Sequence, residues 1–584
     1  MTIKTTNDQR KARPSTGSGR ALRVSLSNPL MVSLSNPLMV SLSNHARFAS
    51  IAFCVVAVVG AAAGAQAPAD SWPTYHGDFS GRRYSTLKQI NAANVKGLTL
   101  AWVYRLNTGQ GGAIVGGEGP ETRPGNATPA TVKSTPLLVN GVLYLSAPDH
   151  VWAIDARTGR EMWHYFWKTR GGDHIGNRGV GIYEKWLYFL TPDNYFVSLD
   201  AGTGKERWHK EIASMKREYF STNAPIIIGK QVIIGVSGDA LDIPGYLESR
   251  DPESGEVVWR WNTTPRKGEP GAETWPDEYA MSHGGGMPWL PGTYDPELNL
   301  YYVGTGNPNP VLAGQSRAGD NLWTCSIVAL NPNTGKMAWG YQVTPHDTHD
   351  WDAAQTPVLI DGVIDGRPRK LVAQANRNGY YVLLDRTNGE HIVTSKFLES
   401  ANWTREINAK GQPIGNPSKE ASVPGTLVSP NTGGATNWPP PSFNPDTGLL
   451  YFGASQTFSI MYLTDTDARP QGWAAAERNV GNVGSSLKAI DYRTGKVRWS
   501  RPLAMTATGS TGGAMGLLST AGGLLFGNDG GGNFVAYDPL TGKPLWHAGL
   551  GVNTSNGPET FLLDGRQYVV VGAGDSLYAF ALQQ

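Results

Sequence analysis

Four ionisable side chains lie within five positions of one another in a weakly charged chain. They are His346, Asp347, His349 and Asp350, and Asp352 follows two residues later. Only 17% of the 584 residues are charged, against about 25% in a typical protein. The segment is therefore the first place to look for chemistry.

Asp350 and Asp352 have the spacing of alternate residues in a strand, which predicts that both carboxylates face one side. Two such carboxylates repel each other unless a cation lies between them, and oxygen ligands suit a hard cation such as Ca²⁺. The local sequence leaves three interpretations. They are a cation site, a turn held by aspartate hydrogen bonds, and a metal hydrolase centre that also uses His346 and His349.

An internal repeat predicts the elements that position this cluster. An apolar residue is followed by Asp, two residues, Thr/Ser-Gly, three residues and Trp. The Asp or Asn, Gly and Trp of the full copies are Asp155, Gly159, Trp163; Asp200, Gly204, Trp208; Asp251, Gly255, Trp259; Asn331, Gly335, Trp339; Asp491, Gly495, Trp499; and Asp538, Gly542, Trp546. A degenerate copy has Asp385, Gly389 and Val393, and Trp102 precedes the first copy.

Each copy predicts a tight turn between two strands, with Asp accepting backbone N–H bonds and Gly taking φ > 0. One small antiparallel sheet cannot bury both faces alone, and radial stacking of such sheets makes a β-propeller. Eight motif positions predict an all-β, eight-bladed propeller with tryptophan-docking motifs over residues 68–584. Long loops are expected in the gaps 259–339 and 393–499. The C-terminal strand 576–582 should cover the sheet edge beside Trp102.

The N-terminal segment predicts export. Arg47 precedes an apolar run at 49–63, and Ala65-Gln66-Ala67 has the small-x-small pattern that signal peptidase prefers. We expect residues 1–67 to be a leader with a signal peptide, cleaved after Ala67, and the mature protein to be periplasmic. An uncleaved anchor is the alternative, although the run is short for a membrane span. No other segment is apolar enough to span a bilayer.

Charge and cysteine content exclude several classes of function. Seven of the basic residues lie in the leader, so the rest of the chain is slightly acidic and has no electrostatic footprint for nucleic acid. Cys54 and Cys325 are too few and too far apart for a disulfide framework, a cysteine zinc site or a haem attachment motif.

The repeat resembles the tryptophan-docking motif of quinoprotein alcohol dehydrogenases, which are eight-bladed propellers that bind pyrroloquinoline quinone (PQQ) at the axis. The resemblance spans roughly residues 71–584 and indicates the soluble type without a haem domain. Residues 344–352 resemble the family signature Thr-Pro-His-Asp-x-Trp-Asp, with His349 in place of the usual Trp. The resemblance implies that Asp350 is the general base and a metal ligand. It also implies that Asp352 is the extra carboxylate of the lanthanide-using branch.

Other family positions follow in order along the chain. The resemblance implies a metal ligand at Asn307, a tryptophan floor for the quinone at Trp289 and a catalytic arginine near the quinone oxygens at Arg377. The remaining implied cofactor-binding residues are Arg178, Thr222, Ser237 and Asn437.

Several positions depart from the family pattern. The family's adjacent cysteines are absent from Gly171–Gly176, and Ala240 occupies the position of a metal-binding Glu, so Asp239 or Asp242 is expected to replace it. Lys133 stands where the family has a Glu near the PQQ carboxylates.

Taken together, the resemblance implies oxidation of a small alcohol to an aldehyde or ketone. The metal, Ca²⁺ or a lanthanide, would polarise the quinone, Asp350 would take the hydroxyl proton, and hydride would pass to PQQ. Electrons would then pass to a separate cytochrome-type acceptor. Ala514 stands where some family members have an axial tryptophan. The absent cysteine pair, Ala240 and Ala514 favour the main alternative, a related propeller that has lost PQQ and its activity. A non-enzymatic envelope scaffold propeller is a second alternative, although such a scaffold needs no axial acids or arginines.

Overall fold

The chain is built almost entirely of β-strands. The computed structural model describes residues 69–106, 131–171, 175–217, 219–238, 242–504 and 515–583. Within these ranges one α-helix occurs, α1 (Glu278–Ser282), together with 3-10 turns at Val95–Gly97, Met215–Arg217, Ala272–Thr274, Gly314–Arg317 and Pro417–Lys419. No helix in these ranges is long and apolar enough to cross a membrane. The predicted all-β class is confirmed.

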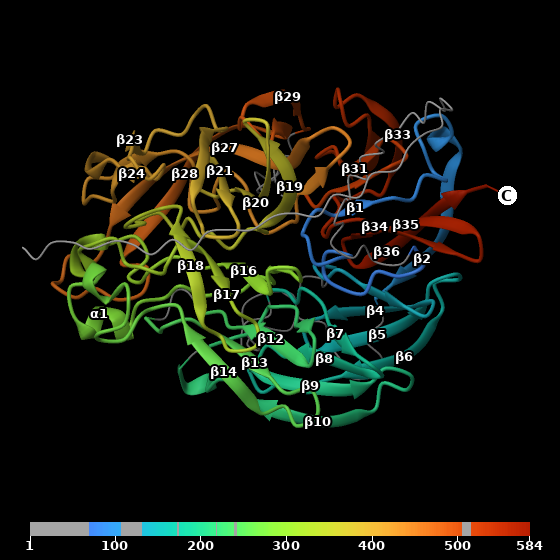
Figure 1. Ribbon diagram of the computed structural model, residues 1–584, viewed down its shortest axis with the longest axis horizontal. Coiled ribbons are helices and arrows are strands. Elements are labelled where there is room, and N and C mark those ends of the chain that lie inside the picture. Colours follow the sequence, from blue (N-terminus) through green and yellow to red (C-terminus); the bar gives the residue numbers. More distant parts are fainter. Residues whose placement is uncertain are drawn as a thin grey trace, which may run out of the picture. The chain divides into compact units, whose positions relative to one another are not determined.

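The described residues form eight sheets of four or five strands and one two-stranded sheet (Figure 1). In chain order the first four sheets are β2 (Leu98–Arg105), β36 (Ser576–Leu582), β35 (Arg566–Ala573) and β34 (Glu559–Leu563); β3 (Leu137–Val139), β4 (Val142–Ala147), β5 (His150–Asp155) and β6 (Glu161–Phe166); β7 (Gly181–Tyr183), β8 (Trp186–Leu190), β9 (Tyr195–Asp200) and β10 (Glu206–Glu211); and β11 (Ile226–Ile228), β12 (Gln231–Gly235), β13 (Tyr246–Arg250) and β14 (Val257–Asn262).

The next sheets follow the same pattern of sequential strands. They are β15 (Thr293–Asp295), β16 (Leu300–Gly304), β17 (Ser326–Leu330) and β18 (Met337–Gln342); β19 (Val358–Ile364), β20 (Arg367–Ala375), β21 (Tyr380–Asp385) and β22 (His391–Lys396); β25 (Thr426–Val428), β27 (Leu449–Leu463), β28 (Ala475–Asp491) and β29 (Val497–Pro502), with β26 (Ser442–Asn444) beside β27; and β1 (Tyr84–Ser85), β30 (Leu518–Thr520), β31 (Leu524–Asn528), β32 (Asn533–Tyr537) and β33 (Pro544–Gly549). The two-stranded sheet is β23 (Thr404–Ile407) with β24 (Pro413–Gly415).

The turn of each repeat has the predicted chemistry. Asp155 Oδ1 accepts hydrogen bonds from the backbone N–H groups of Arg157 and Thr158, and Gly159 has φ +71°. A Cβ atom at Gly159 would lie 2.7 Å from the ring of Trp102. The glycine is therefore needed both for the left-handed backbone and for the close approach of the indole.

Each motif tryptophan reaches the turn of the following sheet. Trp102 Nε1 donates to the carbonyl of Ala156 at 3.1 Å. The later donor and acceptor pairs are Trp163 to Ala201, Trp208 to Glu253, Trp259 to Pro332, Trp339 to Arg386, Trp499 to Pro539 and Trp546 to Leu98. The last of these pairs links the eighth sheet to β2 of the first.

Two further predictions about the chain path are confirmed. β2 pairs antiparallel with β36, so the C-terminal strand covers the edge beside Trp102. The gap 259–339 holds α1, and the gap 393–499 holds β23, β24 and the extended β27–β28 hairpin. The predicted leader, residues 1–67, lies outside the described residues.

Candidate active site

The predicted site residues lie on loops at the ends of strands from several sheets. Asp350 and Asp352 lie between β18 and β19, and Arg377 lies between β20 and β21. Arg178 precedes β7, Thr222 precedes β11, Ser237 follows β12, Trp289 precedes β15, Asn307 follows β16 and Asn437 precedes β26.

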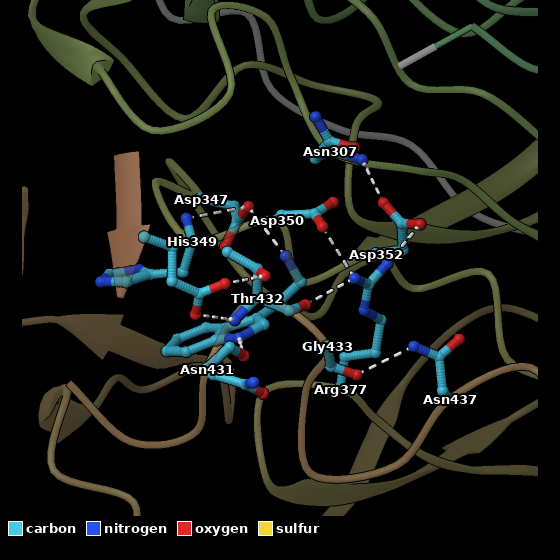
Figure 2. A network of polar contacts seen from close by, with 12 residues as sticks. Asn307, Asp347, His349, Asp350, Asp352, Arg377, Asn431, Thr432, Gly433 and Asn437 are labelled. Atoms are coloured by element: carbon cyan, nitrogen blue, oxygen red, sulfur yellow. Dashed lines mark hydrogen bonds and ion pairs between the residues drawn. The ribbon is translucent and has the colours of Figure 1, made fainter. Parts of the chain in front are cut away.

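Asp350 and Asp352 converge on one guanidinium group (Figure 2). Arg377 Nη2 lies 2.8 Å from Asp350 Oδ2, and Arg377 Nη1 lies 2.8 Å from Asp352 Oδ2. All three residues are at most 6% exposed. Arg377 Nη2 also donates to the Thr432 carbonyl at 2.6 Å, which fixes the orientation of the guanidinium. Two carboxylates and one guanidinium leave a buried excess of negative charge.

Asp352 also joins two other predicted site residues. Its Oδ1 accepts the backbone N–H of Asn307 at 2.6 Å, and its Oδ2 accepts Trp289 Nε1–H at 2.8 Å. The structure thus brings together Asn307, Trp289, Arg377 and both acids from four separate loops.

The expected strand geometry of the acidic pair is wrong. The segment from Thr344 to Thr356 is a loop, and Asp350 has φ +64°. The carboxylates face one way because Arg377 binds both of them, and not because a pleated strand alternates its side chains.

The described residues offer some of the oxygen atoms that a hard cation would need. They hold no group of three or more His, Cys, Asp and Glu side chains arranged around a metal position. However, Asn307 Oδ1 is buried and has no hydrogen-bond partner, while its Nδ2 faces the Pro308 carbonyl at 3.2 Å. An unpartnered amide oxygen beside Asp352 fits a hard cation.

Asp239 and Asp242 are the other acidic residues predicted as metal ligands. Asp242 Oδ2 accepts the backbone N–H of Gly472 at 2.7 Å, so this carboxylate has a partner elsewhere. Asp239, together with Ala240, Ala514 and the middle of the cysteine-free loop, lies outside the described residues.

Arg178 lies on an aromatic platform. Its guanidinium carbon is 5.4 Å from the ring centre of Trp289 and 4.3 Å from that of Trp438. Arg178 is 3% exposed, and its Nε and Nη1 have no hydrogen-bond partner. Burial lowers the pKa of Arg178 to about 10. A buried guanidinium with unused donors fits a bound carboxylate.

Polar groups surround this platform. Thr222 Oγ1 lies 3.1 Å from Ser237 Oγ and donates to the Trp289 carbonyl at 3.4 Å. The Thr222 carbonyl accepts the backbone N–H of Arg178 at 3.0 Å. Asn437 Nδ2 donates to the Gly433 carbonyl at 2.8 Å, in the loop that also binds Arg377.

The histidines of the cluster contact backbone carbonyls. His349 Nε2 lies 2.9 Å from the Lys419 carbonyl and its ring stacks on Trp351, while His346 Nδ1 lies 2.7 Å from the Gly319 carbonyl. Burial lowers the pKa of each to about 4. These contacts give both rings a structural role, and do not support the hydrolase interpretation.

Asp347 matches the turn interpretation. Its Oδ2 accepts the backbone N–H groups of Trp351 at 3.1 Å and His349 at 3.4 Å. Burial raises the pKa of Asp347 to about 6. Asp347 therefore shapes the loop that presents Asp350 and Asp352.

Sequence reasoning missed Trp438 and Thr432. Trp438 contributes the second aromatic ring beside Arg178, and the Thr432 carbonyl orients Arg377. The position of Trp438 next to Asn437 was the available signal. A backbone carbonyl, however, has no side-chain identity that a sequence could reveal.

Comparisons with known proteins place the chain in a family. The chain matches the family described as PQQ: glucose/ethanol/alcohol dehydrogenase, β-propeller domain, over residues 72–424 and 484–569. It is 37% identical to a quinohemoprotein alcohol dehydrogenase of Comamonas testosteroni, covering 86% of this chain and 72% of the relative. It is 33% identical to quinoprotein alcohol dehydrogenase PedH of Pseudomonas putida, covering 85% and 84%.

Solved structures support the same relationship. The crystal structure of the Comamonas testosteroni enzyme matches with a TM-score of 0.77 at 33% identity, covering 89% of this chain and 81% of that one. A europium-containing methanol dehydrogenase matches with a TM-score of 0.76 at 28% identity, covering 88% and 99%. The chain is therefore a β-propeller member of the PQQ-dependent alcohol dehydrogenase family.

Proposed function

We propose that this protein is an exported, eight-bladed PQQ-dependent dehydrogenase that oxidises a small alcohol and passes electrons to a separate cytochrome-type acceptor. The observation that carries this proposal is the buried unit of Asp350, Asp352 and Arg377 beside the Trp289 platform. The eight larger sheets and their successive tryptophan contacts support the blade number.

Five residues of the platform would hold PQQ. Arg178 offers unused donors for a carboxylate, and Trp289 offers a flat face. Thr222, Ser237 and Asn437 place polar groups around that face. When bound, PQQ supplies a quinone that accepts hydride from the alcohol carbon.

Asp350 is the proton acceptor in this proposal. Its carboxylate is held in one orientation by the ion pair with Arg377 and by its buried loop. A carboxylate fixed in this way can take the hydroxyl proton as the C–H bond breaks. Arg377 itself orients Asp350 and Asp352 and lies at the position that the family resemblance assigns near the quinone oxygens.

Asn307, Asp350 and Asp352 would bind a Ca²⁺ or lanthanide ion, with Asp239 as a further candidate. The excess negative charge and the unpartnered Asn307 Oδ1 support a cation here. A relative named for europium and the second acid at Asp352 favour a lanthanide.

The proposed export rests on the leader sequence, and the proposed electron acceptor rests on the name of a relative. Residues 1–67 have the pattern of a signal peptide, which supports a periplasmic location. A relative from Thauera butanivorans, 30% identical, is named 1-butanol dehydrogenase (cytochrome c).

The test is reconstitution of the purified protein with PQQ and either Ca²⁺ or a light lanthanide. We expect quinone absorbance in the protein and oxidation of primary alcohols with an artificial electron acceptor. Asp350→Asn should retain the bound quinone and lose turnover by about 100-fold or more. No bound quinone, or full turnover in Asp350→Asn, would contradict the proposal. Measuring the turnover of Asp352→Asn with Ca²⁺ and, separately, with the lanthanide tests which of the two ions the Asp352 carboxylate serves.

A further inference from the structure

Lys133 lies beside Arg178 at the edge of the cofactor platform. A Cβ atom at Gly176 would lie 2.7 Å from Arg178 Nη1 and 2.8 Å from Lys133 Cδ, so both side chains border the same point. Lys133 Nζ donates to the carbonyl of Ile175. Lys133 thus lies near Arg178 and contacts the backbone of Ile175, in the segment where the resemblance expects cysteines.

The two cations have no internal counter-charge in the described part of the chain. Neither Lys133 nor Arg178 forms a salt bridge there. Burial and the charge of Arg178 lower the pKa of Lys133 to about 8. Two adjacent like charges with partial burial are unfavourable unless an anion lies against both.

We propose that Lys133 is a cofactor-binding cation that acts with Arg178 to bind the carboxylates of PQQ. This inference rests on the proposed function and assigns a role to a residue at which the chain departs from its family. Where the resemblance expects a glutamate, this chain has the opposite charge. The contact with the cofactor must therefore be an ion pair.

Gly176 leaves room for this pair of cations. A side chain there would require Arg178 or Lys133 to move, because Arg178 Nη1 and Lys133 Cδ lie 2.7 and 2.8 Å from its Cβ position. The hydrogen bond from Lys133 also engages the carbonyl of Ile175, next to Gly176. In this proposal the ammonium group binds that carbonyl and one end of the cofactor.

The test measures PQQ affinity in the metal-free apoprotein by quenching of tryptophan fluorescence. We expect Lys133→Gln to raise the Kd about tenfold or more, since one charge-assisted contact is lost. Lys133→Arg should remain within about threefold of the natural protein, because it keeps the charge. Lys205→Gln, at an exposed turn, is the matched control and should leave the Kd unchanged.

A second readout separates an ion pair from a structural role. The PQQ affinity of Lys133→Gln should fall less steeply with added salt than that of the natural protein, since fewer charges are paired. Equal Kd values for Lys133→Gln and the natural protein would overturn the inference. Failure of the natural protein to bind PQQ would instead overturn the proposed function.

Discussion

Replacing Asp352 by alanine tests whether this carboxylate organises the site. Asp352 is 2% exposed and accepts hydrogen bonds from Arg377 Nη1, Trp289 Nε1 and the Asn307 backbone N–H, at 2.8, 2.8 and 2.6 Å. The substitution removes a partner from two buried donors, Arg377 and the Asn307 N–H, and from the half-buried Trp289, and the three donors come from three different loops.

The size of the effect follows from these contacts. A hydrogen bond to a charged group contributes about 1.5–3 kcal/mol, and the three are not additive because Arg377 keeps Asp350 and the Thr432 carbonyl. Because Arg377 stays paired with Asp350, the substitution leaves no unpaired buried charge. The loss comes mainly from Trp289 Nε1–H and the Asn307 N–H, at about 1–3 kcal/mol for each donor left without this partner. We therefore expect Asp352→Ala to lower the free energy of unfolding by about 2–4 kcal/mol.

Urea unfolding of the apoprotein measures this loss without any contribution from cofactor or metal. Glu256→Ala is the matched control, because its ion pair with Lys210 is exposed, with side chains 68% and 41% accessible. An exposed pair contributes about 0–1 kcal/mol. If the two variants lose stability to within about 1 kcal/mol of each other, Asp352 is not the structural hub described here.

Two further predictions concern pH and backbone conformation. His346 is neutral in the fold because burial and Arg317 lower its pKa to about 4, from 6.5. Below pH 6.5 the unfolded chain therefore binds a proton that the folded chain does not. The free energy of unfolding should fall by up to about 1.4 kcal/mol per pH unit between pH 6.5 and 4. His346→Asn, which tolerates the local φ of +51°, should flatten this decline, and parallel pH curves for the two proteins would contradict the reasoning. Gly434→Ala should lower the free energy of unfolding by about 1–3 kcal/mol more than Gly565→Ala. The two glycines have nearly the same φ, +78° and +77°, but only a Cβ at Gly434 would collide, 2.6 Å from Arg377 Cβ. Equal urea midpoints for the two variants would contradict this reasoning.

The fold was predictable because its signal repeats. The Asp, Gly and Trp positions recur with the same spacing, and each states a local requirement: a capped turn, a positive φ and an indole against the next turn. Each copy of the repeat can therefore be recognised in the sequence by itself. The pairing of the C-terminal strand with the strand that holds Trp102 was predictable for a related reason, since an unpaired strand edge needs a partner.

The site was only partly predictable because its geometry depends on loops that share no period. The residue types at Asp350, Asp352 and Arg377 indicated charge chemistry, but strand spacing suggested the wrong cause for the convergence of the acids. The positive φ of Asp350 and the Thr432 carbonyl, which set the real arrangement, are properties of the backbone. Sequence reasoning therefore identifies the chemical groups more reliably than their geometry.

Trp289 separates two regions of opposite charge, and this separation can orient a bound cofactor. On one side its Nε1 donates to Asp352, beside Asp350 and Arg377. Over its ring lies the guanidinium of Arg178, next to Lys133. An anionic planar molecule on this indole is attracted at the end with Arg178 and Lys133 and repelled at the acidic end. Under the proposed function, the carboxylates of PQQ would therefore lie with the two cations, and the quinone would lie at the end with Asp350, where a proton acceptor is needed.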